Sequence, residues 1–178
     1  LRSSLTDLQL VGTVRAFGLF SAPSLALEVA PAAEDPIAAG TLNDWFQAPE
    51  KTTVSPLQMA LVAATLTNDG YQPAPKLANS YQDENGNWIA FGQSTTQQQI
   101  LGSAVAFRIR ERLKAEKQAI WYQVGHANIA DDEPLTWYIG GTTPEWTGTP
   151  LAIAIAIEGS QPALALQIGS ALLNPAAP

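Results

Sequence analysis

The stretch SPLQMALVAATLTNDG, residues 55–70, is the clearest structural signal in this sequence of 178 residues. Ser55 is a favourable N-cap, and Pro56 suits the first helical position because its missing N–H would have no helical partner there. Gly70 is suited to end the helix in a left-handed conformation. Apolar residues lie on two sides of the stretch: Leu57, Leu61 and Ala64 on one, Val62 and Leu66 on the other. We therefore expect a largely buried helix.

The residues before this helix carry a weaker pattern. Leu5, Leu8 and Val11 recur at helical spacing and predict a helix over about 5–17. Residues 21–54 contain repeated Pro and scattered Ala, a composition that interrupts regular structure. We expect this segment to be irregular but packed, because long structureless loops are uncommon inside compact domains.

The residues after the helix indicate a hairpin and a second helix. Asn85-Gly86 separates two short alternating runs and predicts a β-hairpin within 77–91. An apolar stripe from Leu101 to Leu113 predicts an amphipathic helix within 97–116. Basic residues are available for its wetter face: Arg108, Arg110, Arg112 and Lys114.

Three strand-like runs occupy the C-terminal third of the chain, and the short links between them favour an antiparallel meander. A final apolar stripe predicts a terminal helix that begins near Ser160 and stops before Pro175. The expected fold class is α+β, an antiparallel sheet with packed helices. The three runs are 118–124, 135–141 and 151–158. The chain then reads as a single domain or part-domain, 1–178: helical and irregular over 1–75, a hairpin over 77–91, a helix over 97–116, and a three-stranded sheet with a terminal helix over 118–173.

The run LAIAIAIE, residues 151–158, is apolar on both faces. Leu151 and the three Ile residues lie on one face and the Ala residues on the other, so both faces should be covered, and the Ala face would allow a helix to approach closely. Such a strand belongs in the interior of a sheet. We expect another chain to pair with its outer edge, most simply in a symmetric homodimer.

The composition excludes several classes of protein. The chain has 9 Lys and Arg against 16 Asp and Glu, and its net charge of −7 would repel phosphates, so we expect no nucleic-acid partner. It has no Cys, which excludes disulfides, iron–sulfur clusters and thiol catalysis. Its longest apolar run, 151–157, is too short to be a membrane segment. Because helical periodicity follows at once on a first residue that is Leu rather than Met, we expect the natural protein to extend further in the N-terminal direction.

The stretch SPLQMALVAATLTNDGYQPAP, residues 55–75, resembles the segment that follows the second active-site motif in the transpeptidase domains of bacterial penicillin-binding proteins, which belong to the serine β-lactamase-like superfamily. That segment typically reads Thr-Pro-Leu-Gln-Met-Ala, then an Ala-rich helix, Asn-x-Gly and Pro. TWYIGGTTP, residues 136–144, is similar to the family's Trp-Phe-x-Gly-x-x-Pro strand, and the order of elements agrees over about 5–173. The resemblance implies the C-terminal portion of such a domain, a peptidoglycan context, and an extracytoplasmic location, either periplasmic or at the cell surface.

The family's chemistry depends on three motifs: Ser-x-x-Lys supplies the nucleophile, Ser-x-Asn relays protons, and Lys-Thr-Gly holds the substrate carboxylate. Neither Ser-x-x-Lys nor Ser-x-Asn occurs in this sequence. Aligning on Gly125 places Gln123, Val124, Gly125 and His126 where Lys, Thr, Gly and Thr would stand, whereas a shift of two places His126 on the Lys position and Ala127 on the Thr position. Neither register keeps a permanent cation, because Gln is uncharged and an unperturbed imidazole has a pKa of about 6.5. The resemblance therefore implies a degenerate site with no catalytic residue.

His126, the single His of the chain, allows two sharper interpretations. With Asp131 or Asp132 it could form a Ser-His-Asp hydrolase, but no Gly-x-Ser-x-Gly elbow is present. With these residues and Glu133 it could bind a divalent metal, but acidic residues in a turn are more often solvated. We favour a polar residue at a strand end, and we predict neither metal nor cofactor. Three Trp residues near this hairpin could form a stacking surface for sugar or peptide, although core packing is favoured: Trp121, Trp137 and Trp146.

The leading hypothesis is a catalytically inactive, transpeptidase-like portion that serves as a binding, scaffolding or regulatory module in a cell-wall context. Its partners would be a cell-wall peptide or another chain pairing with 151–158. One alternative is the C-terminal half of an active D,D-transpeptidase or carboxypeptidase whose Ser-x-x-Lys lies upstream. A second alternative is an esterase-like hydrolase that uses His126.

Overall fold

The computed structural model describes residues 6–25, 29, 33–47, 53–91, 97–128 and 133–174. These residues form helices and antiparallel strands, so the expected α+β class is confirmed. None of the helices among them is long and apolar enough to cross a membrane. In chain order the elements are α1 (Asp7–Ala16), α2 (Leu42–Gln47), α3 (Pro56–Thr67), β1 (Tyr71–Gln72), β2 (Ser80–Gln82), β3 (Trp88–Ala90), β4 (Gln98–Gln99), α4 (Ser103–Leu113), β5 (Ile120–Asn128), β6 (Pro134–Thr142), β7 (Ala152–Glu158) and α5 (Pro162–Leu173).

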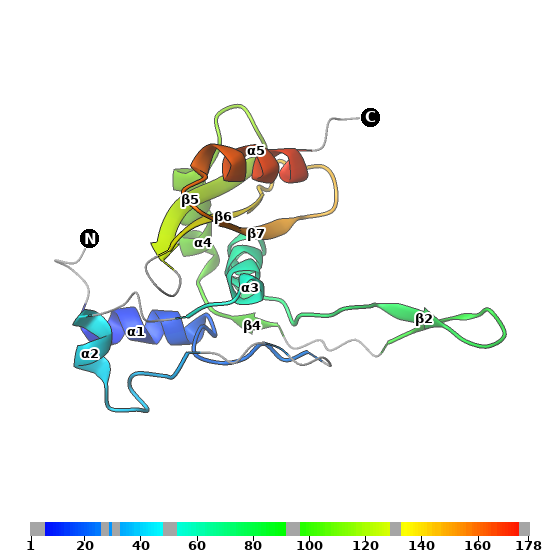
Figure 1. Ribbon diagram of the computed structural model, residues 1–178. Helices are drawn as coiled ribbons and strands as arrows, with labels where there is room; N and C mark the ends of the chain where they lie inside the picture. The colour runs from blue at the N-terminus through cyan, green and yellow to red at the C-terminus, as the bar shows by residue number, and fades with distance from the viewer. Residues whose placement is uncertain are drawn as a thin grey trace.

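The three-stranded antiparallel sheet has the order β5-β6-β7, as the meander predicted (Figure 1). Its first two strands are longer than the apolar runs that predicted them, because the pairing of β5 with β6 continues from Ile120 opposite Thr142 to Asn128 opposite Pro134. Helix α5 covers one face of the sheet and α3 the other. The sheet is therefore the middle layer between two helices.

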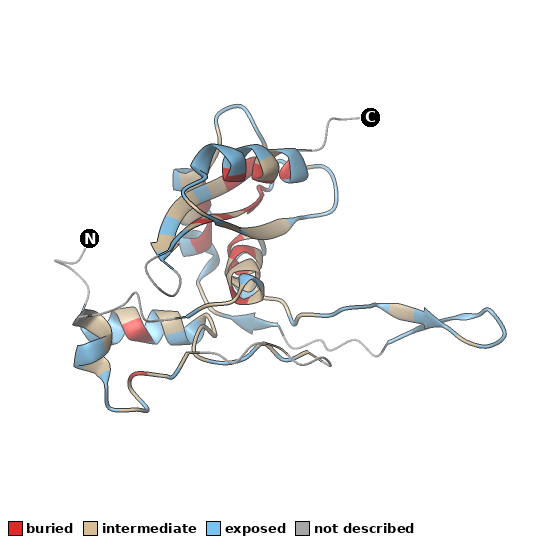
Figure 2. Cartoon of the chain, in the orientation of Figure 1, coloured by how far each residue is buried: buried red, intermediate tan, exposed pale blue. Residues whose placement is uncertain are grey.

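Helix α3 has the ends that its sequence predicted. The Ser55 hydroxyl accepts a hydrogen bond from the backbone N–H of Gln58, the Gln58 side chain accepts one from the backbone of Ser55, and Pro56 begins the helix. Gly70 has φ +88° just beyond the C-cap Asn68, and a Cβ there would overlap the backbone of Leu101. Residues 57–67 are all buried or half-buried (Figure 2), so the prediction of a largely buried helix is confirmed.

The core forms on both sides of the sheet. Ile120, Tyr138, Ala165 and Leu173 pack between the sheet and α5, and a second cluster lies between the sheet and α3. That second cluster consists of Ala63, Leu66 and Trp121, with Ala152 of β7 against it. The Ile residues of β7 pack on the α5 side, so both faces of β7 are covered and a helix lies against its Ala face, as expected.

Two predictions for the irregular parts are corrected. Residues 21–54 were expected to lack regular structure, but they contain the short helix α2, where the backbone N–H of Trp45 bonds the carbonyl of Thr41 and the Trp45 ring packs edge-on against Phe20 and Phe46. The helix expected within 97–116 is shorter, because residues 98–99 form strand β4 opposite β1 and Gly102 is the N-cap of α4.

The predicted hairpin within 77–91 is confirmed as β2 and β3. It projects well away from the rest of the chain (Figure 1). The short pair β1–β4 lies at its root, with Tyr71 opposite Gln99 and Gln72 opposite Gln98. We refer to residues 77–91 as the hairpin arm.

Candidate functional site

The residues that the resemblance aligns with the third motif, Gln123 to His126, lie on β5 at one edge of the sheet and are called the remnant below. Strand β6 is its neighbour on the inner side. On the outer side, a bridge between Lys114 and Trp121 and a hydrogen bond from the Ala115 N–H to the Ile120 carbonyl occupy only the first residues of the strand. Beyond that bridge, no strand among the residues that the structure describes pairs with the outer edge of β5.

The remnant is divided between the two faces of the sheet. Tyr122 and Val124 pack against the α5-side core, whereas Trp121 packs against the α3-side core. Because side chains alternate along a strand, Gln123 and Gly125 belong to the α3 side and His126 to the α5 side. The structure therefore does not bring Gln123 and His126 together on one surface.

The backbone groups of β5 also alternate in direction. The Thr143 N–H bonds the Ala119 carbonyl, so the odd-numbered residues that continue this pattern direct their backbone groups towards β6. The even-numbered residues then direct theirs outward, and the bond that the Ile120 carbonyl accepts from outside agrees with this. The Tyr122 N–H flanks the bridge to Lys114, so the open outward positions beyond that bridge are Val124 and His126.

Gln123, which one of the two alignments considered above places at the position of the family's Lys, has an exposed side chain. Its Nε2 donates a hydrogen bond of 2.7 Å to the carbonyl oxygen of Val124, one of the outward groups of β5. A Cβ on Gly125 would have no atom within 4 Å, so the α3-side surface next to Gln123 is open. This part of the edge offers space and backbone groups but no positive charge.

The nearby basic side chains, Lys114 and Arg110, form ion pairs with other residues. The Lys114 Nζ lies 2.8 Å from a carboxylate oxygen of Glu145, and this hydrogen bond is the main cause that lowers the pKa of Glu145 to about 2. Arg110 is buried at the C-terminal end of α3 and pairs with Asp69 at 2.6 Å. Neither side chain therefore supplies a free positive charge beside Gln123.

His126 is exposed and lies opposite Thr136 in the strand register. The Thr136 hydroxyl is already used, because it donates to the Gly159 carbonyl and accepts from the Gln161 N–H, each at 2.8 Å. Asp131 and Asp132 lie outside the described residues, so neither the hydrolase nor the metal interpretation is tested by distance. Glu133 is exposed at the start of β6.

The three Trp residues near the sheet do not form one stacking surface. Trp121 is fully buried, and its Nε1 donates a 3.2 Å hydrogen bond to the hydroxyl of Thr67. Trp146 lies in the turn after β6, where its Nε1 bonds the carbonyl of Thr149. The favoured interpretation, core packing, is correct for Trp121.

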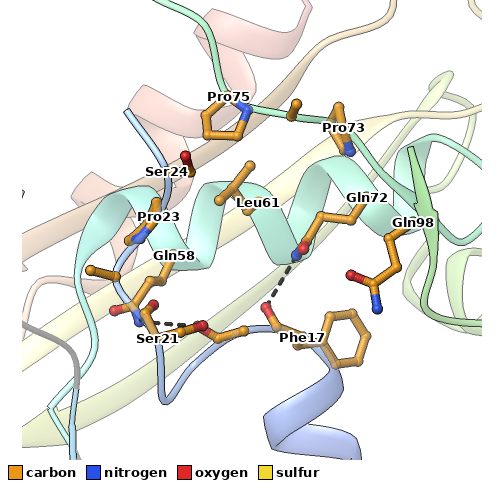
Figure 3. Close-up of a pocket in the computed structure, with 13 residues that line it drawn as sticks. Phe17, Ser21, Pro23, Ser24, Gln58, Leu61, Gln72, Pro73, Pro75 and Gln98 are labelled. Atoms are coloured by element: carbon orange, nitrogen blue, oxygen red, sulfur yellow. Dashed lines mark hydrogen bonds between the residues drawn. The ribbon is translucent and has the colours of Figure 1, made fainter. Parts of the chain in front are cut away.

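Sequence reasoning did not identify a cavity of about 230 Å³ at the N-terminal end of α3 (Figure 3). Phe17, Pro23, Leu61 and Pro73 are among its lining residues. Gln58 is buried beneath it and donates from Nε2 to the carbonyls of Gly18, Leu19 and Ser21 at 3.1–3.3 Å. The single Gln within the apolar stretch of α3 was the available signal, since a buried amide requires partners.

No family model matches this chain, and no curated protein matches it. Several solved structures, in contrast, match it over most of its length. Penicillin-binding protein A from M. tuberculosis, in its imipenem acyl-enzyme complex, matches with a TM-score of 0.75 and 25% identity over 93% of this chain. Its penicillin G acyl-enzyme complex gives a TM-score of 0.77 at 24% identity over 97% of the chain.

The fold is that of a penicillin-binding protein transpeptidase domain. The D,D-transpeptidase domain of a peptidoglycan glycosyltransferase from Eggerthella lenta also matches, at TM-score 0.66 and 18% identity over 96% of the chain. The chain spans only 41%, 43% and 49% of these three structures, less than half of each. The resemblance inferred from residues 55–75 and 136–144 is thus confirmed for the fold.

Proposed function

We propose that this chain is a transpeptidase-like module that lacks catalytic residues of its own and binds an extended cell-wall peptide along the outer edge of β5, in an extracytoplasmic setting. The observation that carries the proposal is the state of the third motif. Among the described residues no strand pairs with the outer edge of β5, and Gln123, which one alignment places at the position of the cation, bonds its own strand. Such a site supports binding without chemistry.

A peptide would bind by adding a strand to β5. The outward N–H and C=O groups of Val124 and His126 would form main-chain hydrogen bonds, which provide affinity in this mode of recognition. The open surface over Gly125, beside the half-buried Trp137, would accommodate one side chain of the peptide. Before a peptide can bond the Val124 carbonyl, the Gln123 amide must release it. In the unbound chain this bond therefore partly protects the edge of β5 from pairing with other strands.

An NMR titration with an N-acetylated tripeptide that ends in D-Ala-D-Ala tests this mode. We expect saturable shifts at the amides of Val124 and His126. Val124→Pro should abolish binding because it removes an outward N–H without removing a ladder bond to β6. Gln123→Ala is the matched variant and should tighten binding, because it frees the Val124 carbonyl. Shifts confined to another surface would contradict the proposal.

Incubation with a fluorescent penicillin, followed by denaturing electrophoresis, tests the absence of chemistry. The chain has no Ser-x-x-Lys to supply an activated serine and no cation on β5 for the drug's carboxylate. We expect no labelled band from the 178-residue chain. A stoichiometric covalent band would overturn the claim of inactivity.

A second candidate function is the C-terminal half of an active transpeptidase. It is favoured by two observations: this chain spans less than half of each of the three matched structures, and two of these are described as acyl-enzyme complexes. An upstream Ser-x-x-Lys in the full reading frame, together with β-lactam labelling of the full-length protein, would establish it. The hydrolase that uses His126 is tested by comparing ester hydrolysis of the wild type with His126→Ala.

We further propose that another chain pairs with the free edge of β7, most simply a second copy. The Thr142 N–H bonds the Leu151 carbonyl and the Gly159 N–H bonds the Pro134 carbonyl, so the odd-numbered residues of β7 face β6. The outward groups then belong to the small residues Ala152, Ala154 and Ala156, which do not shield them.

A symmetric antiparallel pair centred on Ile155 would join these outward groups. It would place Ala154 opposite Ala156 and Ala152 opposite Glu158, so the two Glu158 carboxylates would not face each other. Light scattering at micromolar concentration should report a dimer that Ala154→Pro dissociates, whereas Ala163→Pro, a change in the first turn of α5, should leave the dimer intact. A monomer whose outward β7 amides exchange freely would contradict this pairing.

A further inference from the structure

The hairpin arm is an ordered structure that presents unusual apolar surface to solvent. Its turn is fixed by Asp83, whose carboxylate accepts hydrogen bonds from the backbone of Asn85 at 2.9 Å and of Asn87 at 2.8 Å, and from the Asn87 side chain at 3.2 Å. The Asn87 bonds are the main cause that lowers the pKa of Asp83. Gln82 bonds the carbonyl of Gly86 across the same turn.

The two faces of the arm differ. Tyr81, Ile89 and Phe91 share one face, where the Tyr81 and Phe91 rings pack with centroids 5.2 Å apart. On the other face Trp88 lies opposite Gln82, and its side chain is 72% exposed. The backbone bonds of Asp83 to Asn87 and of Phe91 to Asn79 make the Gln82–Trp88 pair a non-hydrogen-bonded one, in which side chains stand closest.

From this geometry we propose that the arm binds neutral glycan chains by stacking a pyranose ring on Trp88. An accessible indole presents a flat apolar surface to the C–H face of a sugar, and the amide of Gln82 and the hydroxyl of Ser80 lie on the same face of the arm for sugar hydroxyls. The acidic residues at the tip, Asp83 and Glu84, disfavour anionic ligands such as nucleic acid or acidic lipid.

The size of the patch argues against a second copy as the occupant. The apolar side chains of the arm could bury only on the order of 300 Å² per partner, whereas a stable protein interface buries roughly 800 Å² per partner. A sugar ring needs no more surface than one indole. The choice of an N-acetylhexosamine chain as the probe rests on the proposed cell-wall function. The argument that a sugar ring stacks on Trp88 is independent of that function.

The test is an NMR titration of the 178-residue chain with the neutral β-1,4-linked tetramer of N-acetylglucosamine. The indole signal of Trp88, assigned by its loss in Trp88→Phe, should shift saturably while the other indole signals stay fixed. Trp88→Ala should weaken binding about tenfold, as expected for the loss of one aromatic stacking contact. Ile89→Thr, on the opposite face and compatible with a strand, should leave the affinity within about twofold.

Four outcomes would overturn the proposal: no shift at millimolar sugar, equal affinity in Trp88→Ala, a Trp88 signal that changes with protein concentration alone, or a blue shift of Trp88 fluorescence on phosphatidylglycerol vesicles. The third would indicate self-association of the arm and the fourth a membrane contact. Failure here is distinguishable from failure of the proposed function, because peptide binding is detected at the β5 amides and sugar binding at Trp88.

Discussion

Replacement of Arg110 by Met should be among the most destabilising single changes where α3 packs against α4. The Arg110 side chain is 2% exposed, and its guanidinium donates to the carbonyls of Leu66 and Thr67 at the end of α3 and pairs with Asp69 at 2.6 Å. A cation is favourable at a helix C-terminus, where carbonyls lack helical partners. Arg110→Met keeps the aliphatic packing but leaves these carbonyls unsatisfied.

The magnitude follows from the number of groups affected. Each buried polar group left without a partner costs about 1–3 kcal/mol, so two carbonyls give a loss of about 3 kcal/mol in the free energy of unfolding. The Arg110 Nε has no hydrogen-bond partner among the residues that the structure describes, so the loss should not be larger. Asp69→Asn is the matched control and should cost less than about 1 kcal/mol, because that carboxylate is 63% exposed.

Urea unfolding followed by Trp fluorescence measures both variants, since Trp121 reports directly on the end of α3 through its bond to Thr67. A midpoint for Arg110→Met equal to that of Asp69→Asn would refute the reasoning. It would show that water satisfies these carbonyls as well as the guanidinium does.

Three further expectations follow from close contacts and charges. Gly169→Ala should destabilise the chain by about 2 kcal/mol in thermal unfolding, because a Cβ there would overlap the ring of Tyr138. The ion pair of Glu145 with Lys114 stabilises the fold at pH above the carboxyl's ordinary pKa of 4.5 and is lost only as pH falls through about 2, so the Glu145 carboxyl signal in NMR should not titrate between pH 5 and 3. His126→Ala should change the unfolding free energy by less than about 1 kcal/mol, since the imidazole is exposed; a larger loss would indicate an unrecognised contact.

The parts of the fold that could be predicted are those in which local chemistry and burial agree. Ser55, Pro56 and Gly70 mark helix ends by backbone chemistry alone, and the alternation in 151–158 correctly predicted two covered faces. Helix α2 was missed because Trp45 packs against the ring of Phe20, which is distant in sequence, and no local pattern reveals that contact.

The candidate site was predictable only as a position in the chain. The residues from Gln123 to His126 were located by analogy to a motif, but which helix covers each face of β5, and so which side each of these residues takes, depends on the packing of the sheet between α3 and α5. The bond from Gln123 to the Val124 carbonyl depends on a side-chain conformation that composition cannot indicate. The role of Gln58 was equally hidden, because its three acceptors lie 37–40 residues away in the chain.

The pairing of β1 with β4 makes the segment between them an excursion that leaves and re-enters the fold at one place. Gly70 receives backbone bonds from both Ile100 and Leu101, so the two ends are fastened to each other and to the end of α3. Lengthening a loop whose ends are already held together costs little, since the entropy of closure grows only slowly with length. The excursion can therefore lengthen, shorten or exchange its tip during evolution while the register of the central sheet stays unchanged.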